Sequence, residues 1–461
     1  MIITLIAFLF ILAFSITIHE FGHFIMAKLF GIPVEKFSIG FGPPLFRTKL
    51  GETDFRIAYF PFGGYVKMAG EEEGEIIKSE KTKLGLSDAP LIHRIGSSVK
   101  MADEEKKIIK KEKSEKPGPE FGFYDAPLIH RILVVFSGPL FNIASAFFVF
   151  ILIYGIFGIY INPYMKIEVT KDSYTQKLGL QSNDSIIAVN GTPVHYWEQF
   201  WKIVDNDPDH IVELTIKRDN KILKKELSIN DDSLGFRALV PAILGDLKLD
   251  GPAYKAGMKK HDRVLMIDDK KINSWYQMVE IVRASKKKPL KFIWLHNGDK
   301  NDAIITPVAF YDPISKDTIG QIGVIMPLTR RHPGLLETFG IAWERSINII
   351  WLTLKTLYQL FIGRISRKAL GGPIAIARLS GESARWGFEN LLGLLAIISI
   401  NLGLINLFPI PALDGGHIVV AIIEGIRRKR FSKKTRLVIQ QIGYTIIILL
   451  ILFVTFNDIT R

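Results

Sequence analysis

The stretch Ser15-Ile16-Thr17-Ile18-His19-Glu20-Phe21-Gly22-His23-Phe24-Ile25-Met26 places two imidazoles and a carboxylate inside an apolar run from Ile2 to Phe30. This run is longer than the roughly 20 residues that a helix needs to cross about 30 Å of hydrocarbon. It has no basic segment at its start and no small-residue cleavage site, so we expect a retained span and not a removable signal peptide. Ionisable groups within a span are costly and usually functional, so the stretch predicts both a membrane helix and a site.

The composition is that of a membrane protein with additional soluble modules. Of the 461 residues, 48% are hydrophobic and 23% are charged, so apolar and polar sequence must be segregated along the chain. The length leaves room for several domains. There is no cysteine, which excludes a disulfide framework and a Cys-ligated metal, so a bound metal would need His and carboxylate ligands.

Three further segments are long and apolar enough to span, at about Ile132–Ile161, Asn390–Glu424 and Leu437–Phe456. A fifth segment, Leu335–Ile362, carries several charged residues. The Lys-rich tract 78–116 and the linker RRKRFSKKTR (427–436) should both be cytoplasmic, and only four spans place them on the same side. We therefore expect 335–362 to be an amphipathic helix at the membrane surface. This topology also accounts for the net charge of +13 without nucleic acid as a partner.

Residues 163–328 contain strand patterns and turns typical of two tandem modules. LDGPAYKAGM (249–258), followed by DRVLMID (262–268), resembles the signature of PDZ domains, and a weaker copy lies at 173–180 and 184–191. Such modules bind an extended peptide by strand addition. The alternative is that they are small sheet domains that bind nothing, because the first copy shows no clear carboxylate-binding loop.

A tandem duplication precedes the second span. VKMAGEEEGEIIKSEK (66–81) recurs as VKMADEEKKIIKKEKSEK (99–116), and DAPLIHRI follows each copy. Only the second DAPLIHRI leads into a span, so residues 71–127 are expected to form a solvated cytoplasmic insertion rich in Lys and Glu. Duplication alone explains the pair His93 and His130, and we expect neither to bind a metal.

His19 and His23 are four residues apart and therefore share one face of a helix. Both can bind one metal ion while Glu20 reaches the water that the ion holds. Zinc lowers the pKa of its bound water to about 7, and an adjacent carboxylate takes the proton as the water attacks a carbonyl. The alternative is that these polar residues are buried for helix packing, but the metalloprotease spacing of all three favours catalysis.

Two histidines leave such a site short of a third protein ligand. The best candidate is Asp414 in NLFPIPALDGGH (406–417), which follows two prolines and precedes two glycines within the third span. The helix should unwind there, and irregular backbone at membrane depth is tolerated where it lines a cavity. A reverse turn at the membrane surface is the alternative, but the apolar run continues afterwards as IVVAIIEGI. His417 is a rival ligand that we place below Asp414.

HEFGH (19–23) in a first span, NLFPIPALDGG (406–416) in a late one, and a PDZ tandem between spans two and three together resemble the site-2 proteases. Among these proteases, the chain most resembles the bacterial type known as regulator of sigma-E protease. The resemblance implies that zinc is held by His19, His23 and Asp414, with Glu20 as the general base.

Two further motifs carry the resemblance. GPLFN (138–142) resembles the family's glycine and asparagine motif, and GGPI (371–374) resembles its loop before the third span. The resemblance implies that Asn142 and Asn406 position the substrate or stabilise the transition state. The region 37–68 would form a small sheet whose edge holds the substrate as an extended strand near the metal.

The expected fold is a polytopic α-helical membrane protein of about four spans, with a membrane-associated β-sheet and two tandem PDZ-like α+β domains. Its expected parts are a first transmembrane helix (1–31), a membrane-associated β region (32–70), the insertion (71–127), a second transmembrane helix (128–162), the first and second PDZ-like domains (163–232 and 233–328), an amphipathic surface helix and loop (329–389), a third transmembrane segment (390–426), and a basic linker with a fourth transmembrane helix (427–461).

The function implied is that of an intramembrane zinc endopeptidase in the cell inner membrane. It would cut the spans of single-pass membrane proteins in regulated intramembrane proteolysis, with anti-sigma factors of the sigma-E stress response and signal-peptide remnants as substrates. The PDZ-like pair would lie on the periplasmic side and act as a size filter, with the basic loops in the cytoplasm.

Two other functions stay open. One is a PDZ-containing membrane scaffold or receptor with a structural metal, although a closed structural site normally has four protein ligands and only three are found. The other is a metal transporter, although no inverted repeat of the spans supports it. The metal's coordination number tests the first alternative, and metal-dependent flux in liposomes tests the second.

Overall fold

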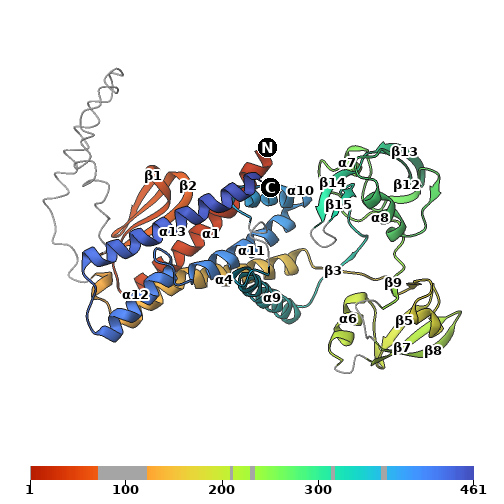
Figure 1. The fold of residues 1–461 in the computed structure, drawn as a ribbon, viewed down its shortest axis with the longest axis horizontal. Coiled ribbons are helices and arrows are strands. Elements are labelled where there is room, and N and C mark those ends of the chain that lie inside the picture. Colours follow the sequence, from red (N-terminus) through yellow and green to blue (C-terminus); the bar gives the residue numbers. More distant parts are fainter. Residues whose placement is uncertain are drawn as a thin grey trace, which may run out of the picture. The chain divides into compact units, whose positions relative to one another are not determined.

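The structure is a computed structural model that describes residues 2–70, 122–207, 211–228, 234–312, 317–364 and 371–460. Its contacts divide the chain into two units. The first comprises residues 1–150, 341–381 and 392–461, and the second comprises residues 151–340 and 382–391 (Figure 1). The insertion expected at 71–127 lies almost wholly outside the described residues, as does His93.

Among the described residues, four helices are long and apolar enough to cross a membrane, which confirms the expected polytopic architecture: α1 (Ile2–Leu29), α4 (Leu128–Ile156), α11 (Phe388–Asn406) and α13 (Lys433–Thr460). A helix bonds its backbone groups within one segment, so it is the form in which such apolar sequence can cross hydrocarbon.

The third span is broken in the middle. α11 ends at Asn406, and α12 (Asp414–Arg427) begins after a gap of irregular backbone. Pro409 and Pro411 lack the N–H that a continuous helix requires. Ala412 has a left-handed φ of 78°. The unwinding expected from the two prolines is therefore present, and it makes Asp414 the first residue of a new helix.

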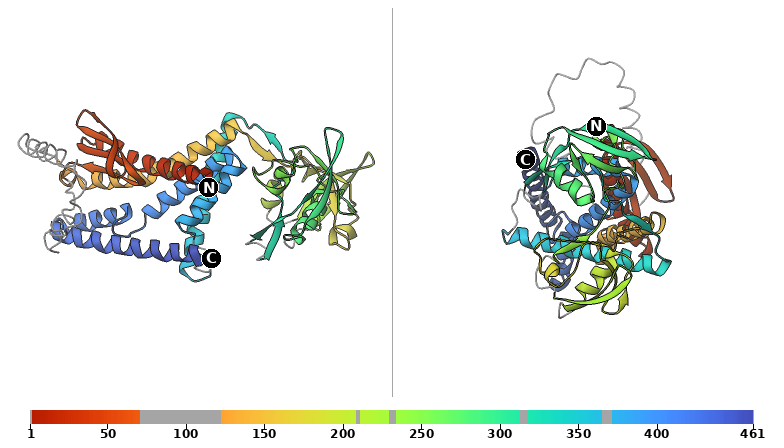
Figure 2. Two further views of the ribbon diagram at one scale, coloured as in Figure 1. Left: turned by 90° about the horizontal axis from the view of Figure 1, so that it is seen from above. Right: turned by 90° about the vertical axis from the view of Figure 1, so that its right-hand side faces the viewer.

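α4 packs closely against two other spans (Figure 2), and glycines at the crossings allow this close approach. A Cβ on Gly22 of α1 would lie 2.5 Å from the carbonyl oxygen of Ser137 on α4. A Cβ on Gly403 of α11 would lie 2.8 Å from the carbonyl oxygen of Pro139 on α4. Small residues allow helix backbones to approach one another within a membrane, so α4 touches both α1 and α11.

α9 (Leu335–Phe361) is the amphipathic helix expected in this region. Trp343 and Trp351 are exposed, whereas Ala342 and Ser346 on another face are buried. Its inner face meets the spans through the hydroxyl of Thr353, which donates to Asn401 of α11 at 2.8 Å. α10 (Pro373–Trp386) follows.

β1 (Val34–Leu50) and β2 (Thr53–Met68) form the sheet expected near the first span. Both strands bend, so the first part of β1 lies between two parts of β2 and pairs with each of them. Phe37 faces Val66 on one side and Phe55 on the other. Within the part of the chain that the structure describes, no further strand pairs with residues 64–68. This end of β2 is therefore an outer edge of the described sheet.

The second unit contains the two α+β modules, and they share one topology. The first has β4 (Ile167–Val169), α5 (Tyr174–Lys177), β5 (Ser185–Val189), β6 (Thr192–Pro193), α6 (Trp197–Asp205), β7 (Ile211–Arg218), β8 (Lys221–Ser228) and β9 (Phe236–Ala238). Its main sheet has the order β6-β5-β7-β8. Because β9 pairs with β4, we place the boundary between the modules after Ala238.

The second module has α7 (Pro252–Lys255), β10 (Arg263–Ile267), β11 (Lys270–Lys271), α8 (Trp275–Ala284), β12 (Leu290–His296), β13 (Asp299–Ile305), β14 (Val308–Asp312) and β15 (Asp317–Gln321). Its sheet order, β11-β10-β12-β13, matches that of the first module element for element. One apolar core, which includes Phe200 and Phe292, runs through both modules. The tandem α+β repeat expected from the sequence is confirmed.

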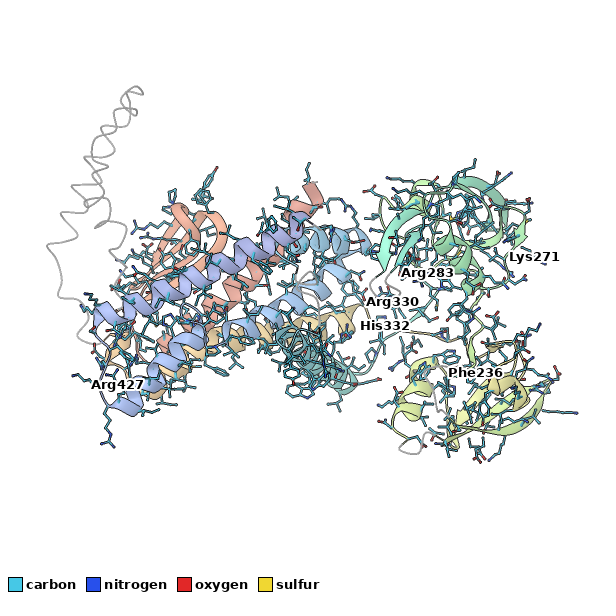
Figure 3. All side chains as sticks on the ribbon, in the orientation of Figure 1. Phe236, Lys271, Arg283, Arg330, His332 and Arg427 are labelled. Carbon is cyan, nitrogen blue, oxygen red and sulfur yellow. The ribbon has the colours of Figure 1, made fainter. Side chains whose placement is uncertain are left out.

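The two ends of the tandem meet in a short ribbon. β3 (Ile159–Ile161) pairs antiparallel with β16 (Thr329–Arg331), and Ile161 lies opposite Thr329. Arg330 donates to the carbonyl of Phe157 at 2.6 Å and to Glu389 at 2.5 Å, which fixes this ribbon at its base (labelled in Figure 3).

Candidate metal centre

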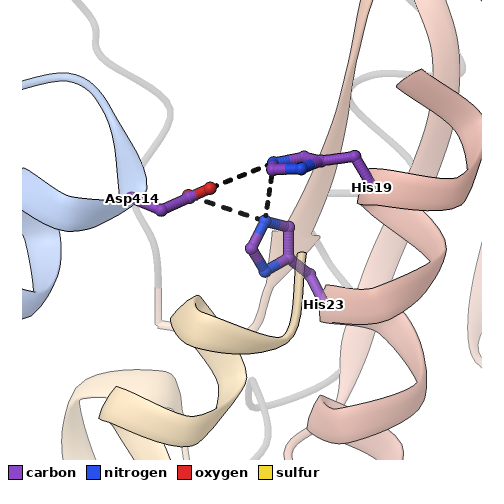
Figure 4. A group of neighbouring side chains, drawn as sticks. All are labelled: His19, His23 and Asp414. Atoms are coloured by element: carbon purple, nitrogen blue, oxygen red, sulfur yellow. Dashed lines mark hydrogen bonds and ion pairs between the residues drawn. The ribbon is translucent and has the colours of Figure 1, made fainter. Parts of the chain in front are cut away.

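The two histidines of HEFGH lie on one face of α1, as their spacing predicts, and both are buried. Their Nε2 atoms are 3.2 Å apart. Asp414, at the start of α12, faces them from across the bundle (Figure 4). Its Oδ2 lies 3.0 Å from Nε2 of His19, and its Oδ1 lies 3.5 Å from Nε2 of His23. Residues almost 400 positions apart in the sequence therefore present three ligand atoms within 4.8 Å of one another.

The donor set of this group fits a zinc ion. Two imidazole nitrogens and a carboxylate are ligands that zinc prefers, and three protein ligands leave one position open for water or substrate. Hydrogen bonding does not account for the arrangement, because Oδ2 of Asp414 is buried and forms no hydrogen bond within the described residues, although His19 is close. A cation among the three side chains would satisfy this oxygen and both nitrogens.

The backbone around Asp414 explains why its carboxylate points inward. A Cβ on Gly415 would lie 2.3 Å from the carbonyl oxygens of Leu407 and Phe408. A Cβ on Gly416 would lie equally close to the carbonyl oxygen of Ile410. The chain can fold back on itself here only because both residues lack side chains. This tight return sets the position at which α12 begins.

The general-base candidate, Glu20, lines a cavity of about 510 Å³ together with the three proposed ligands. Residues 64–68, at the outer edge of β2, form part of the same wall. A Cβ on Gly64 would lie 2.9 Å from Cγ of Glu20, so the missing side chain makes room for the glutamate. His417 also lines the cavity but does not belong to the group of three ligand atoms.

Asn142 and Asn406 both lie beside His19, but in different surroundings. Nδ2 of Asn406 is 3.3 Å from Nε2 of His19, and Asn406 lines the cavity. Nδ2 of Asn142 is 3.3 Å from the other ring nitrogen, Nδ1, and this residue is completely buried outside the cavity lining. The structure therefore brings both asparagines to the site and leaves only Asn406 in reach of a substrate.

Two contributors to the candidate site, Val134 and Gly138, are not among the catalytic, metal-binding and substrate-binding residues expected from sequence. The carbonyl oxygen of Val134 lies 2.8 Å from Nδ1 of His23. Gly138 lies directly against the imidazoles, since a Cβ there would be 2.3 Å from Nε2 of His23. Every residue has a backbone carbonyl, so the identity of Val134 does not indicate this role. Gly138 belongs to the GPLFN motif, and this motif is the sequence signal that could have indicated its role at the site.

Comparison with known proteins gives relatives over the whole chain. The profile of peptidase family M50 matches residues 7–450. A putative zinc metalloprotease of Neisseria meningitidis is 32% identical over 99% of both chains. The zinc metalloprotease RasP of Oceanobacillus iheyensis is 30% identical over 99% of both chains, and the regulator of sigma-E protease RseP of Salmonella typhimurium is 28% identical over 99% of this chain and 98% of its own.

Solved structures of PDZ domains match part of the chain. The PDZ domain of an SdrC-like protein from Listeria monocytogenes is 19% identical, covers 18% of this chain and 87% of its own, and gives a TM-score of 0.16.

Proposed function

This chain belongs to peptidase family M50, the site-2 protease family of zinc metalloproteases, and from that premise we propose that it cleaves peptide bonds inside the membrane spans of its substrates. The observation that carries the proposal is the cavity lined by Glu20, the three candidate ligands and the edge of β2, beside helices long enough to cross a membrane.

We propose that His19, His23 and Asp414 hold the zinc ion and that Glu20 is the general base. When bound, zinc supplies a water molecule of lowered pKa and a positive charge beside the scissile carbonyl. The carboxylate of Glu20 then takes the proton of the attacking water and passes it to the leaving amide nitrogen. Asn406, which lines the cavity beside His19, would donate its amide N–H to the substrate carbonyl as negative charge develops there.

The sheet edge at residues 64–68 suits an extended substrate. In a helix, the carbonyl of each peptide bond is already hydrogen-bonded and shielded by its own turn. A substrate span must therefore unwind before water can attack it. Pairing with an edge strand supplies new backbone hydrogen bonds to the unwound segment and holds it extended. Because this edge and Glu20 line one cavity, the bound segment would lie against the catalytic residues.

The substrates that we propose are single-pass membrane proteins already shortened by another protease, of the anti-sigma factor or signal-peptide remnant type. The names of the relatives, among them a regulator of sigma-E protease, support the first of these classes. The two PDZ-like modules would exclude substrates that retain a large outer domain and would contact the peptides of those admitted.

The orientation follows from charge. The basic linker after α12, in which Arg427 is labelled in Figure 3, would lie in the cytoplasm, and the modules would lie on the periplasmic side of the inner membrane.

The test is cleavage of a single-span reporter without its outer domain by the purified protein and by Glu20→Gln. We expect the variant to bind zinc as the wild type does and to lose activity by about 100-fold or more, since general-base catalysis typically contributes 10²- to 10⁴-fold. An active Glu20→Gln enzyme would contradict the mechanism. Bound zinc without cleavage of any reporter in a panel of different spans would favour the scaffold alternative.

A further inference from the structure

The outer nitrogens of both histidines face a single helix, α4. Nδ1 of His23 lies 2.8 Å from the carbonyl oxygen of Val134, and Nδ1 of His19 lies 3.3 Å from the carboxamide of Asn142. Val134 and Asn142 are separated by about two turns of α4, and the two histidines are separated by about one turn of α1. Each imidazole is thus bracketed between the candidate metal position and a polar group on α4.

A histidine that binds a metal through Nε2 must carry its proton on Nδ1, and it almost always donates this proton to a neighbouring acceptor. The carbonyl of Val134 can serve His23 in this way. For His19, the carboxamide of Asn142 lies at Nδ1 on the α4 side, and Nδ2 of Asn406 on α11 lies 3.5 Å from the same nitrogen. The nitrogen of the Asn142 carboxamide faces the ring, while its oxygen is buried and forms no hydrogen bond within the described residues. A 180° turn about the Cβ–Cγ bond brings the oxygen to Nδ1 as an acceptor.

We propose that Asn142 is a positioning residue for the metal: its amide oxygen accepts the Nδ1 proton of His19 and so keeps the Nε2 lone pair directed at zinc. This proposal rests on the proposed function, because it takes His19 as a ligand. It also gives Asn142 a role other than the substrate contact expected from sequence. The side chain of Asn142 is completely buried and does not line the cavity, so it cannot reach a substrate there.

The surroundings of Asn142 support a fixed position. The hydroxyl of Ser399 on α11 donates to the backbone carbonyl of Asn142 at 3.0 Å, and the hydroxyl of Ser145 donates to the same carbonyl at 2.8 Å. These contacts hold the backbone and leave the carboxamide for His19. Ser145 also provides a control, because removing its hydroxyl disturbs the same turn of α4 without touching the imidazole.

The experiment measures zinc affinity in the full-length protein in detergent, by competition with a chelator of known affinity. Asn142→Leu keeps the approximate size of the side chain and removes the acceptor, whereas Asn142→Asp keeps an acceptor. We expect Asn142→Leu to weaken zinc binding about 10- to 100-fold, the usual effect of losing a partner of a metal-bound histidine. Asn142→Asp and the control Ser145→Ala should bind zinc within a few-fold of the wild type.

Three outcomes would overturn the proposal: wild-type affinity in Asn142→Leu, an equal loss in Asn142→Asp, or an equal loss in Ser145→Ala. Replacing zinc with cobalt gives a second measurement that does not depend on activity, because the visible spectrum of cobalt reports its coordination. We expect that spectrum to change in Asn142→Leu and to persist in Asn142→Asp. The variant His19→Ala distinguishes a failure of the role proposed for Asn142 from a failure of the proposed ligand set. If His19→Ala loses zinc while Asn142→Leu keeps it, only the role of Asn142 fails, whereas zinc retention by His19→Ala contradicts the proposed ligand set itself.

Discussion

The absence of a single methyl group at Gly138 determines whether the proposed ligands have room. A Cβ at this position would lie 2.3 Å from Nε2 of His23 and 2.9 Å from Cε1 of His19. We therefore expect Gly138→Ala to displace the imidazoles and to lower both zinc content and proteolytic activity by at least about 10-fold. The change is measured as zinc bound per protein after dialysis against a weak chelator.

Gly155→Ala is the matched control, because it lies on the same helix and a Cβ there meets nothing within 4 Å. Alanine at this position should leave zinc content unchanged and raise helix stability slightly, by about 0.5–1 kcal/mol. If Gly138→Ala binds zinc as tightly as Gly155→Ala does, the close packing of α4 on the histidines has no role in metal binding.

Gly64 should behave differently, because its Cβ would press on Glu20 and not on a proposed ligand. A methyl group there would lie 2.9 Å from Cγ of Glu20 and the same distance from the carbonyl oxygen of Ser38. We expect Gly64→Ala to reduce turnover about 10-fold or more, as Glu20 leaves its working position, with zinc still bound. Zinc content and the turnover number are measured on the same sample. Loss of zinc from this variant would show that the sheet supports the ligands instead of the base.

At the scale of residues, the members of the proposed site that could be predicted are those whose side chains carry chemistry. His19, Glu20 and His23 follow from helical spacing, and Asp414 follows from a carboxylate placed where prolines interrupt a span. The contributions of Val134 and Gly138 depend on a backbone oxygen and on a missing atom. Their role appears only when α4 is placed against α1, and no local pattern in the sequence determines that contact.

At the scale of the elements, a buried carboxylate and two arginines join the ends of three helices. Glu424, on α12, is 3% exposed and lies 2.9 Å from Arg131 at the start of α4 and 2.8 Å from Arg436 at the start of α13. Phe431 also donates its backbone N–H to Glu424 at 2.9 Å. α13 is otherwise only slightly buried, so this cluster is its main polar attachment at that end.

Glu424→Gln would leave two guanidinium groups without their carboxylate. Breaking a buried pair by removing one partner costs about 3–5 kcal/mol, because the remaining charge stays desolvated. We expect a clearly lower thermal midpoint in detergent for Glu424→Gln. The exposed pair of Arg430 and Asp125 gives the comparison, and Asp125→Asn should cost less than about 1 kcal/mol. Equal midpoints for the two variants would contradict the assignment.

The prolines, glycines and apolar runs allowed the spans and the break in the third span to be predicted. The pairing of β1 was not predicted. Phe37 pairs with both Phe55 and Val66 because β1 and β2 bend at left-handed glycines, among them Gly40. A pattern of alternating residues indicates a strand but not which partners it has, since register depends on contacts between distant positions.

At the scale of the molecule, a polar network within the second unit joins the ribbon at the base of the tandem to the second module. Tyr160 of β3 donates to Asp246 at 2.9 Å, and Lys260 bonds the same carboxylate at 2.6 Å. Burial alone would raise the pKa of Asp246, but the hydrogen bonds from Lys260 and Tyr160 outweigh it and hold this pKa below its usual range. Burial, together with the hydrogen bond to Asp246, raises the pKa of Tyr160 to about 12.

A carboxyl group whose pKa is lower in the folded state stabilises the fold above its unfolded pKa, near 4, and loses this contribution as the pH falls through the folded value. The stability difference between the wild type and Asp246→Asn should therefore be full at pH 6 and shrink steadily below about pH 4. Thermal midpoints of both proteins across this range measure it. A difference that stays constant down to pH 2 would contradict the role of the ionised carboxylate.

Removing the tandem of modules would break the bond of Tyr160 to Asp246 and the bond of Leu249 to Arg385, but not the pairing of β3 with β16. Ile161 lies opposite Thr329 in the ribbon, and residues opposed in an antiparallel pair have Cα atoms about 5 Å apart. A two-residue Asn-Gly turn can therefore replace residues 162–328. Arg330 would keep its bonds to Phe157 and Glu389, which do not involve the modules.

If the modules act as a size filter, this excised chain should cleave a single-span substrate with its outer domain intact, which the wild type leaves uncut. Substrates without that domain should be cut at similar rates by both, because the proposed catalytic groups all lie in the first unit. The excised chain carrying Glu20→Gln controls for contaminating proteases. An excised chain that binds zinc and cuts only the shortened substrate would show that discrimination lies within the membrane, at the cavity and the outer edge of β2.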